Sequence, residues 1–192
     1  MHFSNGENDD AFCNLVDAVE LAVDAATQVA AVHIAAVHIA AALARQFEGL
    51  FLKPYLCPAG VATVGYGATY YEDGTRVQLT DPPITRERAE ALLLWMLRTV
   101  YLPTVLKLCP GVDAPNRLAV LLDFTFNLGE GNLKASTLLK RVNAGDWAAV
   151  PGELRKWVRG GGRVLRGLVL RREAGVMLLY SRRATSLPAL PP

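Results

Sequence analysis

Basic residues are absent from the first 44 positions of this sequence. No lysine or arginine precedes Arg45, whereas the same stretch holds six acidic residues. A cleaved secretory signal begins with a positively charged region, so the sequence predicts no signal of that kind. The residues from Arg45 onward therefore carry all 20 basic side chains and the other 12 acidic ones, an excess that favours attraction to anionic polymers.

Cysteine is also scarce. The sequence has three, Cys13, Cys57 and Cys109, and no two of them have the Cys-x-x-Cys spacing of a zinc site. Three cysteines are too few for a disulfide scaffold, and we expect neither a metal nor another cofactor. The glycines at 160–162 follow no predicted strand and lack the spacing of a phosphate-binding loop, so we expect no nucleic-acid partner.

The composition is that of a globular protein with a sizeable core. Apolar residues make up 52% of the chain and charged residues 20%, which excludes a disordered protein. The 192 residues are the length of one domain. We expect an N-terminal helical extension at 1–44, the main domain at 45–183 and a frayed tail at 184–192.

An alanine-rich, uncharged run covers residues 27–44, and its block AAVHI occurs twice in succession, at 30–34 and 35–39. The run is close to the length of a membrane-spanning helix. Two histidines lie inside it, and the basic residues follow it, which disfavours a span whose N-terminus is cytoplasmic. We predict a soluble helix and no stable membrane span; a weak, releasable anchor is the alternative.

The amino-acid composition changes after this run. Residues 57–80 are rich in glycine, β-branched and aromatic residues and contain Asp73-Gly74, a pair typical of hairpin turns. The rest of the chain has helical periodicity. We expect helices to begin at Thr85, at Asp113 with Pro115, at Ser136 or Thr137, and at Asp146, and one helix to end near Gly129. A flexible joint at 160–162 would precede a last helix at 168–180. The sequence therefore predicts an α+β fold: an alanine-rich N-terminal helix, a small antiparallel sheet and a mostly helical lobe.

Glu48 is the first candidate for chemistry. It ends the predicted N-terminal helix in the string ARQFEGLFLKPY, just before the predicted sheet. A carboxylic acid between apolar rings and facing a cleft can be desolvated enough to keep its proton near neutral pH, as a general acid must. By composition alone, a solvated glutamate at a helix end is the simpler interpretation.

The spacing around Glu48 favours the catalytic interpretation. Eight residues separate Glu48 from Cys57, five separate Cys57 from Thr63, and VGYGAT follows. This pattern resembles the phage lysozyme family, glycoside hydrolase family 24, whose motif is Glu, eight residues, Asp or Cys, five residues, Thr. The strings FNLGEGNLKASTLLKRVNAGDW at 126–147 and the stretch at 157–173 also match, so the resemblance covers about residues 44–180.

The resemblance implies a lysozyme-like fold and a muramidase, an endolysin that hydrolyses the β-1,4 bond between N-acetylmuramic acid and N-acetylglucosamine in bacterial peptidoglycan. Glu48 would donate a proton to the leaving oxygen, and Thr63 would help to position the attacking water. Cys57 stands where most members have Asp, and could act as base, water-positioner or nucleophile. The family is usually regarded as inverting, which requires about 6.5–9.5 Å between the partner groups.

Further positions follow from the same resemblance. Thr69 ends a string in which this chain has Ala68 where most relatives have His, and we expect Thr69 to contact substrate. Phe126 lies where relatives line the saccharide cleft, with a core aromatic as the alternative. Ser136 or Thr137 matches a sugar-contacting hydroxyl, with a helix cap as the alternative. Arg171 or Arg172 matches a basic position that faces the glutamate and favours its ionised form.

Two other functions stay open at this point. A lytic transglycosylase also uses one glutamate but leaves an anhydro-muramic product, and the Thr63 spacing favours the hydrolase. A non-catalytic protein could instead disrupt membranes with its basic helix at 163–183. We expect a monomer whose partner is the peptidoglycan glycan strand. It would accumulate in the host cytoplasm and reach the periplasm or cell wall through a separate pore.

Overall fold

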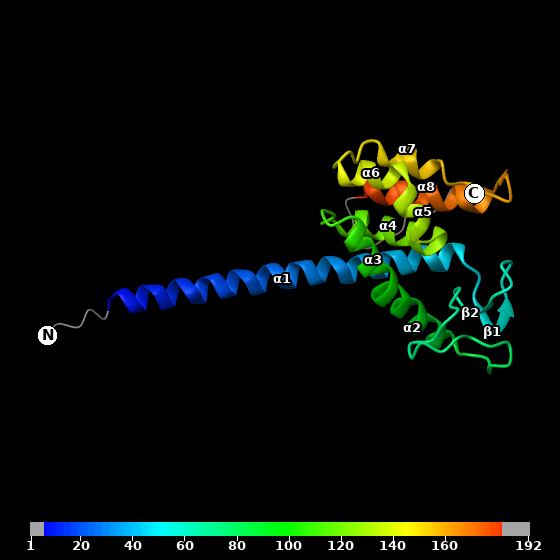
Figure 1. The fold of residues 1–192 in the computed structure, drawn as a ribbon, viewed down its shortest axis with the longest axis horizontal. Helices are drawn as coiled ribbons and strands as arrows, with labels where there is room; N and C mark the ends of the chain where they lie inside the picture. The colour runs from blue at the N-terminus through cyan, green and yellow to red at the C-terminus, as the bar shows by residue number, and fades with distance from the viewer. Residues whose placement is uncertain (1–5, 182–192) are drawn as a thin grey trace.

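One long helix dominates the outline of the molecule (Figure 1). The computed structural model describes residues 6–181, except for the side chains of residues 6–17 and 19. Helix α1 runs without interruption from Gly6 to Phe47, so no break marks the boundary predicted at residue 45. Its C-terminal part lies within the folded body, and its N-terminal part projects away. The predicted tail at 184–192 and the side chain of Cys13 lie outside the described residues.

The buried part of α1 explains why the helix is rich in alanine. Ala36, Ala40, Ala41 and Ala44 are fully buried, together with Leu43. This face packs along α4 (Pro115–Leu128), and small side chains let two helix backbones approach closely. The alanine-rich N-terminal helix expected from the sequence is therefore confirmed, and its last three turns belong to the core.

A two-stranded antiparallel sheet follows α1. Strand β1 (Phe51–Leu56) pairs with β2 (Ala62–Gly65), with Tyr55 opposite Thr63 and a register shift between Phe51 and Tyr55. The shift surrounds Pro54, which has no N–H to give to a ladder. The predicted small sheet is confirmed, but the position of its hairpin was wrong. The tight turn lies at residues 57–61, where Gly60 adopts a φ of +76°.

The Asp73-Gly74 pair does form a turn, but outside the sheet. The Gly74 N–H donates to Tyr71 O at 3.0 Å, and the flanking residues Tyr70 and Arg76 form a single isolated bridge. Most of residues 70–76 are exposed, so little apolar burial supports longer strands here. The local turn signal was correct and the strands expected on either side of it were not.

The next helical stretch runs across one side of α1. It consists of α2 (Arg86–Met96), a π-helical turn η1 (Leu97–Tyr101) and α3 (Leu102–Leu108). Thr85 caps α2 as expected, since its hydroxyl accepts from the Arg88 N–H at 3.1 Å. Pro103 cannot donate a backbone hydrogen bond, and the π-turn directly before it accommodates the interrupted ladder.

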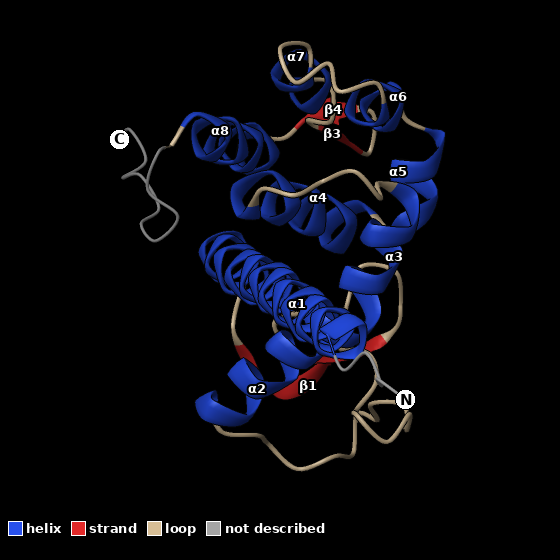
Figure 2. Cartoon of the chain, turned by 90° about the vertical axis from the view of Figure 1, so that its left-hand side faces the viewer, coloured by secondary structure: helices blue, strands red, loops and turns tan. Residues whose placement is uncertain are grey.

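The remaining helices form the second half of the body around α4 (Figure 2). Helix α4 begins at Pro115, as predicted, but Ala114 rather than Asp113 precedes it, without a side-chain cap. Gly129 ends α4 with a φ of +85°. Asp146 lies one turn ahead of the helix that it was expected to cap, and its side chain accepts the Ala149 N–H at 3.3 Å directly before that helix begins. Helix α5 was not predicted. The later helices are α5 (Glu130–Ala135), α6 (Thr137–Asn143), α7 (Val150–Arg155) and α8 (Arg166–Tyr180).

The three glycines at 160–162 were expected to form a flexible joint and instead form a hairpin. Strand β3 (Arg159–Gly160) pairs with β4 (Arg163–Val164) across Gly161 and Gly162. Both turn glycines have positive φ, +57° and +79°, as the tightest hairpin turn requires. This small hairpin leads directly into α8.

Two helical stretches of the described chain are long and apolar enough to cross a membrane. They are Glu20–Phe47, with a mean hydropathy of 1.6, and Arg86–Leu108, with 1.4. A helix in the core of a soluble protein meets the same criteria, and each of these stretches contributes buried residues to the core. Hydropathy is therefore weak evidence for a membrane span here.

Candidate active site

Glu48 lies directly after the last turn of α1, where the chain turns toward β1. Its backbone N–H donates to Ala44 O at 2.8 Å, the last bond of the helical ladder. Gly49 follows because a Cβ there would lie 2.6 Å from the Phe51 ring. The Glu48 side chain keeps 31% of its exposure. It lines an open pocket together with Phe47, Asn127, Leu165, Gly167, Leu168 and Arg171.

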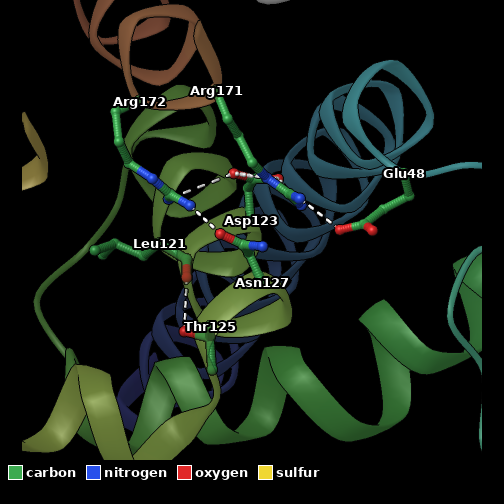
Figure 3. A network of polar contacts seen from close by, with 7 residues as sticks. All are labelled: Glu48, Leu121, Asp123, Thr125, Asn127, Arg171 and Arg172. Atoms are coloured by element: carbon green, nitrogen blue, oxygen red, sulfur yellow. Dashed lines mark hydrogen bonds and ion pairs between the residues drawn. The ribbon is translucent and has the colours of Figure 1, made fainter. Parts of the chain in front are cut away.

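Arg171 on α8 reaches Glu48 across this pocket (Figure 3). One guanidinium nitrogen, Nη1, lies 2.5 Å from Glu48 Oε1. The same guanidinium contacts Asp123 of α4, with Nη2 at 2.7 Å from Oδ1 and Nε at 3.1 Å from both carboxylate oxygens. Arg171 and Asp123 are each 97% or more buried by side chain. Asp123 therefore holds the Arg171 guanidinium in place, and the guanidinium in turn holds the Glu48 carboxylate.

Arg171 keeps its positive charge despite its burial. Burial disfavours the cation, but the ion pairs with Asp123 and Glu48 outweigh it and raise the pKa of Arg171 above its ordinary value. Of the two arginines suggested by the sequence, Arg171 is thus the one that faces Glu48.

Arg172 points the other way and completes the buried network. It donates to Asn127 Oδ1 and lies 3.9 Å from Asp123 Oδ2. Burial lowers the pKa of Arg172 to about 10, with Asp123 acting in the opposite sense and Arg171 in the same sense. The cluster therefore joins two basic side chains, Arg171 and Arg172, to two acidic ones, Asp123 and Glu48, and of the two acids Glu48 is the one that lines the pocket.

Cys57 begins the turn between β1 and β2. Its N–H donates to Val61 O at 3.0 Å and its carbonyl accepts from the Gly60 N–H at 2.8 Å. The pKa of the Cys57 thiol is lowered, mainly because the backbone N–H groups of Val61 and Ala59 hydrogen-bond the sulfur. Desolvation raises it slightly, and the buried Thr63 hydroxyl lowers it further. The turn thus favours a thiolate at this position.

Two tyrosines connect Glu48 with the rest of the site. The pKa of Tyr55 is raised, first by burial and then by the negative charges of Cys57 and Glu48, so both groups act on one hydroxyl. The pKa of Tyr101 is raised by burial and then by Glu48. Tyr101 also meets Phe126 edge-on, with 5.4 Å between ring centroids. The helix end, the hairpin turn and η1 therefore converge on Glu48.

A family model for phage lysozyme matches residues 45–175 of this chain. The chain is 37% identical over 145 residues to an endolysin of Acyrthosiphon pisum secondary endosymbiont phage 1, which covers 72% of this chain and 93% of that protein. The chain belongs to the phage lysozyme family. A SAR-endolysin of Bacteriophage PS119 is 35% identical over 127 residues, 66% of this chain and 72% of its own length.

Solved structures agree with this assignment. An endolysin from Escherichia coli O157:H7 phage FAHEc1 superposes with a TM-score of 0.66 at 27% identity, over 79% of this chain and 94% of that one. A mutant of P22 lysozyme gives 0.64 at 26% identity, over 74% and 95%. The predicted lysozyme-like fold is thereby confirmed. This phage lysozyme is an endolysin, a hydrolase of the muramidase type that lyses the host cell wall.

The substrate contacts expected of this phage lysozyme fall in different surroundings. Thr69 lines a hollow with Tyr70, Tyr71, Glu72, Gly74, Trp95, Met96, Val100 and Tyr101. Tyr101 links this hollow to Phe126, whose ring it meets edge-on at 5.4 Å between centroids. Phe126 is half-buried beside Arg171, whose Cζ lies 5.9 Å from its ring centroid. Both positions border the surroundings of Glu48.

Ser136 and Thr137 lie at the start of α6. The Ser136 hydroxyl accepts from the Leu139 N–H at 3.0 Å and donates to Leu133 O at 2.6 Å. A hydroxyl has one proton, so its donor capacity is already used within the helix cap. Ser136 is buried and Thr137 is exposed. These contacts favour the helix-cap alternative for Ser136 and leave Thr137 as the accessible hydroxyl.

Asp123 is the site residue that the sequence analysis missed. It stands in the string LLDFTF, where every neighbour is apolar except Thr125. A lone carboxylate in such a run is almost never buried without a partner, and this was the available signal. In the described part of the chain, no group of three or more His, Cys, Asp or Glu side chains could hold a metal ion.

Proposed function

We propose that this endolysin cleaves the β-1,4 bond of peptidoglycan with Glu48 as proton donor and with Cys57 and Thr63 acting on the attacking water. The proposal rests on one observation: Glu48 lines an open pocket beside Arg171, and the strand pair that begins three residues later carries Cys57 at its turn and Thr63 on β2. The motif spacing supports it, since Cys57 and Thr63 belong to the hairpin that follows Glu48.

The proton and the water would move as follows. The Glu48 carboxyl gives its proton to the glycosidic oxygen as the bond from that oxygen to the anomeric carbon breaks. Water attacks the anomeric carbon from the opposite face and donates to the Thr63 hydroxyl oxygen, whose own proton is given to Val61 O at 2.9 Å. The Cys57 thiolate accepts the proton that the water loses, and the lowered pKa of Cys57 favours that thiolate. One water is consumed, and the muramic acid is left with a free reducing end.

Arg171 has a positioning part in this proposal. Its guanidinium bonds Glu48 Oε1 and leaves the other carboxylate oxygen free of this contact. The cation stabilises the carboxylate that remains after proton transfer. We assign sugar contacts to Thr69, Phe126 and Thr137 and a helix-capping role to Ser136.

The setting of the reaction belongs to the same proposal. We propose a monomer that collects in the host cytoplasm and acts in the periplasm or cell wall after passing a separate pore. No stable membrane span is included, because residues 36–44 of the only N-terminal apolar stretch among the described residues are packed in the core. The alternative, export through an N-terminal apolar helix, is favoured by the SAR-endolysin names of several relatives.

The variant Glu48→Gln tests the proton donor. The amide keeps the shape of the side chain but has no transferable proton, so we expect hydrolysis of purified peptidoglycan to fall by about 10²–10⁴-fold. Glu130→Gln, an exposed acid on α5, is the matched control and should keep full activity. Near-wild-type turnover by a folded Glu48→Gln variant would falsify the assignment.

Mass spectrometry of the products separates the two enzyme alternatives. A hydrolase leaves reducing muramic ends, whereas a lytic transglycosylase leaves anhydro ends that lack one water. We expect reducing ends from the wild type and neither product from Glu48→Gln. A non-catalytic membrane disruptor would lyse cells equally well with either form.

A further inference from the structure

Helix α2 is the element on which the β1–β2 hairpin packs. The Ile84 N–H, just before α2, donates to Leu52 O of β1 at 2.8 Å. At the end of β2, Gly65 adopts a φ of +65°, and a Cβ there would lie 3.3 Å from the Ala89 Cβ. Ala89 is buried, so the strand approaches α2 closely at this point. The position of α2 therefore sets the position of the strand that carries Thr63.

Glu90 of α2 bonds to two other elements at once. Its Oε1 accepts from the Tyr66 hydroxyl at 2.7 Å, and its Oε2 accepts from Arg45 Nε. Tyr66 directly follows β2, and Arg45 lies in the last turn of α1, three residues before Glu48. Among the described residues, Glu90 is the side chain that joins the helix end leading to Glu48 with the end of the strand carrying Thr63.

Tyr66 is held firmly enough to transmit this contact to the strand. Only 4% of Tyr66 is exposed. The chain loops tightly around it, because Val64 and Ala68 exchange both backbone hydrogen bonds at 2.9 Å. Val64 directly follows Thr63, so a displacement of the Tyr66 ring displaces Val64 and, with it, Thr63.

Both contacts favour the ionised form of Glu90. Burial raises the pKa of Glu90, but the bonds from Tyr66 and Arg45 outweigh burial and hold that pKa below its ordinary value. The pKa of Tyr66 is raised, first by burial and then by its bond to Glu90, so the hydroxyl keeps the proton that it donates. The Glu90 and Arg45 side chains keep 27% and 34% of their exposure. Water therefore screens the ion pair, and its effect on geometry exceeds its effect on stability.

Glu48 is held from two sides of α1. Figure 2 shows α1 between α2 on one side and α4 with α8 on the other. Arg171 and Asp123 hold the Glu48 carboxylate from the side of α4 and α8. Glu90 holds the end of α1 from the side of α2 and does not line the Glu48 pocket. The first contact orients the carboxylate, and the second acts on the distance between Glu48 and the hairpin.

We infer that Glu90 is a positioning residue, which sets the separation between Glu48 and the hairpin groups Cys57 and Thr63. The inference rests on the proposed function, in which a water fits between the proton donor and the hairpin. An inverting hydrolase needs about 6.5–9.5 Å between the partner groups, and a misplacement of about 1 Å is enough to slow the chemical step strongly. Loss of the Glu90 link should therefore lower kcat and leave KM nearly unchanged.

The variant Glu90→Gln tests this inference on soluble peptidoglycan fragments. The amide oxygen can still accept from the Tyr66 hydroxyl, but the charge that pairs with Arg45 is lost. We expect kcat to fall at least about tenfold, while KM stays within about threefold of the wild type. Glu87→Gln is the matched control, because Glu87 is an exposed acid one turn earlier on α2, and it should keep the wild-type kcat.

The variant Tyr66→Phe breaks the other half of the link. It should lower kcat with little change in KM, as Glu90→Gln does. The double variant Glu90→Gln/Tyr66→Phe should lose little more than the more impaired single variant, because both bonds belong to one connection. Losses that multiply in the double variant would contradict a single connection.

Hydrogen–deuterium exchange without substrate shows whether the link acts through the hairpin, even if Glu48 is not the proton donor. We expect amides 62–65 to exchange faster in Glu90→Gln than in the wild type or Glu87→Gln, because the strand end loses its support on α2. A wild-type kcat of folded Glu90→Gln, measured well below its Tm, would overturn the inference, since Glu90 would then only stabilise the fold. A lowered kcat with unchanged exchange at 62–65 would overturn it as well.

Discussion

The substitution Asp123→Asn removes one negative charge from the centre of the buried network. Wild-type Asp123 makes three contacts of 2.7–3.1 Å with Arg171 and is 97% buried by side chain. The asparagine keeps the shape but leaves two buried guanidinium groups facing one partly exposed carboxylate. Removing one partner of a buried ion pair costs about 3–5 kcal/mol, because the other charge stays buried without compensation.

This cost predicts a measurable loss of stability. For a chain of this size each kcal/mol lowers Tm by about 2–4 °C, so Asp123→Asn should melt about 6–20 °C below the wild type. Urea unfolding, monitored by circular dichroism, gives the free energy of unfolding directly. Asp146→Asn is the control, because its ion pair with Arg141 is exposed and worth about 0–1 kcal/mol.

The same variant should also slow hydrolysis. With Asp123 neutral, Arg171 loses the charge-assisted contacts that fix its guanidinium beside Glu48, so the proton donor is less well positioned. We expect peptidoglycan hydrolysis to fall at least about tenfold. The rate is measured on folded protein, well below its Tm, so that lost stability does not imitate lost chemistry.

A double variant separates packing from positioning. Asp123→Leu/Arg171→Met removes the closest ion pair together but leaves Arg172 buried without its carboxylate neighbour. It should therefore regain only part of the lost free energy of unfolding, while hydrolysis stays low because Glu48 no longer has its positioning cation. An Asp123→Asn variant within 1 kcal/mol of the wild type and equally active would refute this reasoning.

Two further predictions concern the thiol and the N-terminal helix. Because the pKa of Cys57 is lowered, iodoacetamide should modify it at lower pH than an ordinary thiol and abolish hydrolysis, whereas Cys109, buried with a pKa of about 11, stays unmodified in the folded protein. Cys57→Asp should stay active and resist the reagent; full activity of the alkylated wild type contradicts the proposed base. Expressed protein should be recovered in the soluble fraction, and carbonate-resistant recovery in the membrane pellet would contradict the absence of a stable span.

The parts of the site that the sequence predicted are close together along the chain. Glu48, Cys57 and Thr63 fall within one helix end and one hairpin, so their spacing already limits their geometry. The same holds for Thr85 as a helix cap and Pro115 as a first helical residue, which act on N–H groups within three positions. Local patterns of this kind can be predicted from the sequence, because residues so close along the chain have few alternative partners.

The parts that were missed depend on contacts between distant residues. Asp123 and Arg171 are 48 positions apart, and nothing near either one indicates that they meet. The hairpin was misplaced for a related reason. Asp73-Gly74 has the stronger local turn signal, but the strands form around residues 57–61, where Val64 and Tyr66 bury apolar surface against the body. Burial, which sequence spacing does not report, decided between the two turns.

The C-terminal part of helix α1 is buried in the core and leads directly to Glu48. Residues from Ala36 onward are packed against α4 and end at the helix terminus that carries Glu48. Glu48 in turn meets Arg171, which extends from α8. The buried alanines therefore act on the site as well as on stability, because a larger side chain at Ala40 or Ala44 would push α1 away from α4 and move Glu48 relative to Arg171.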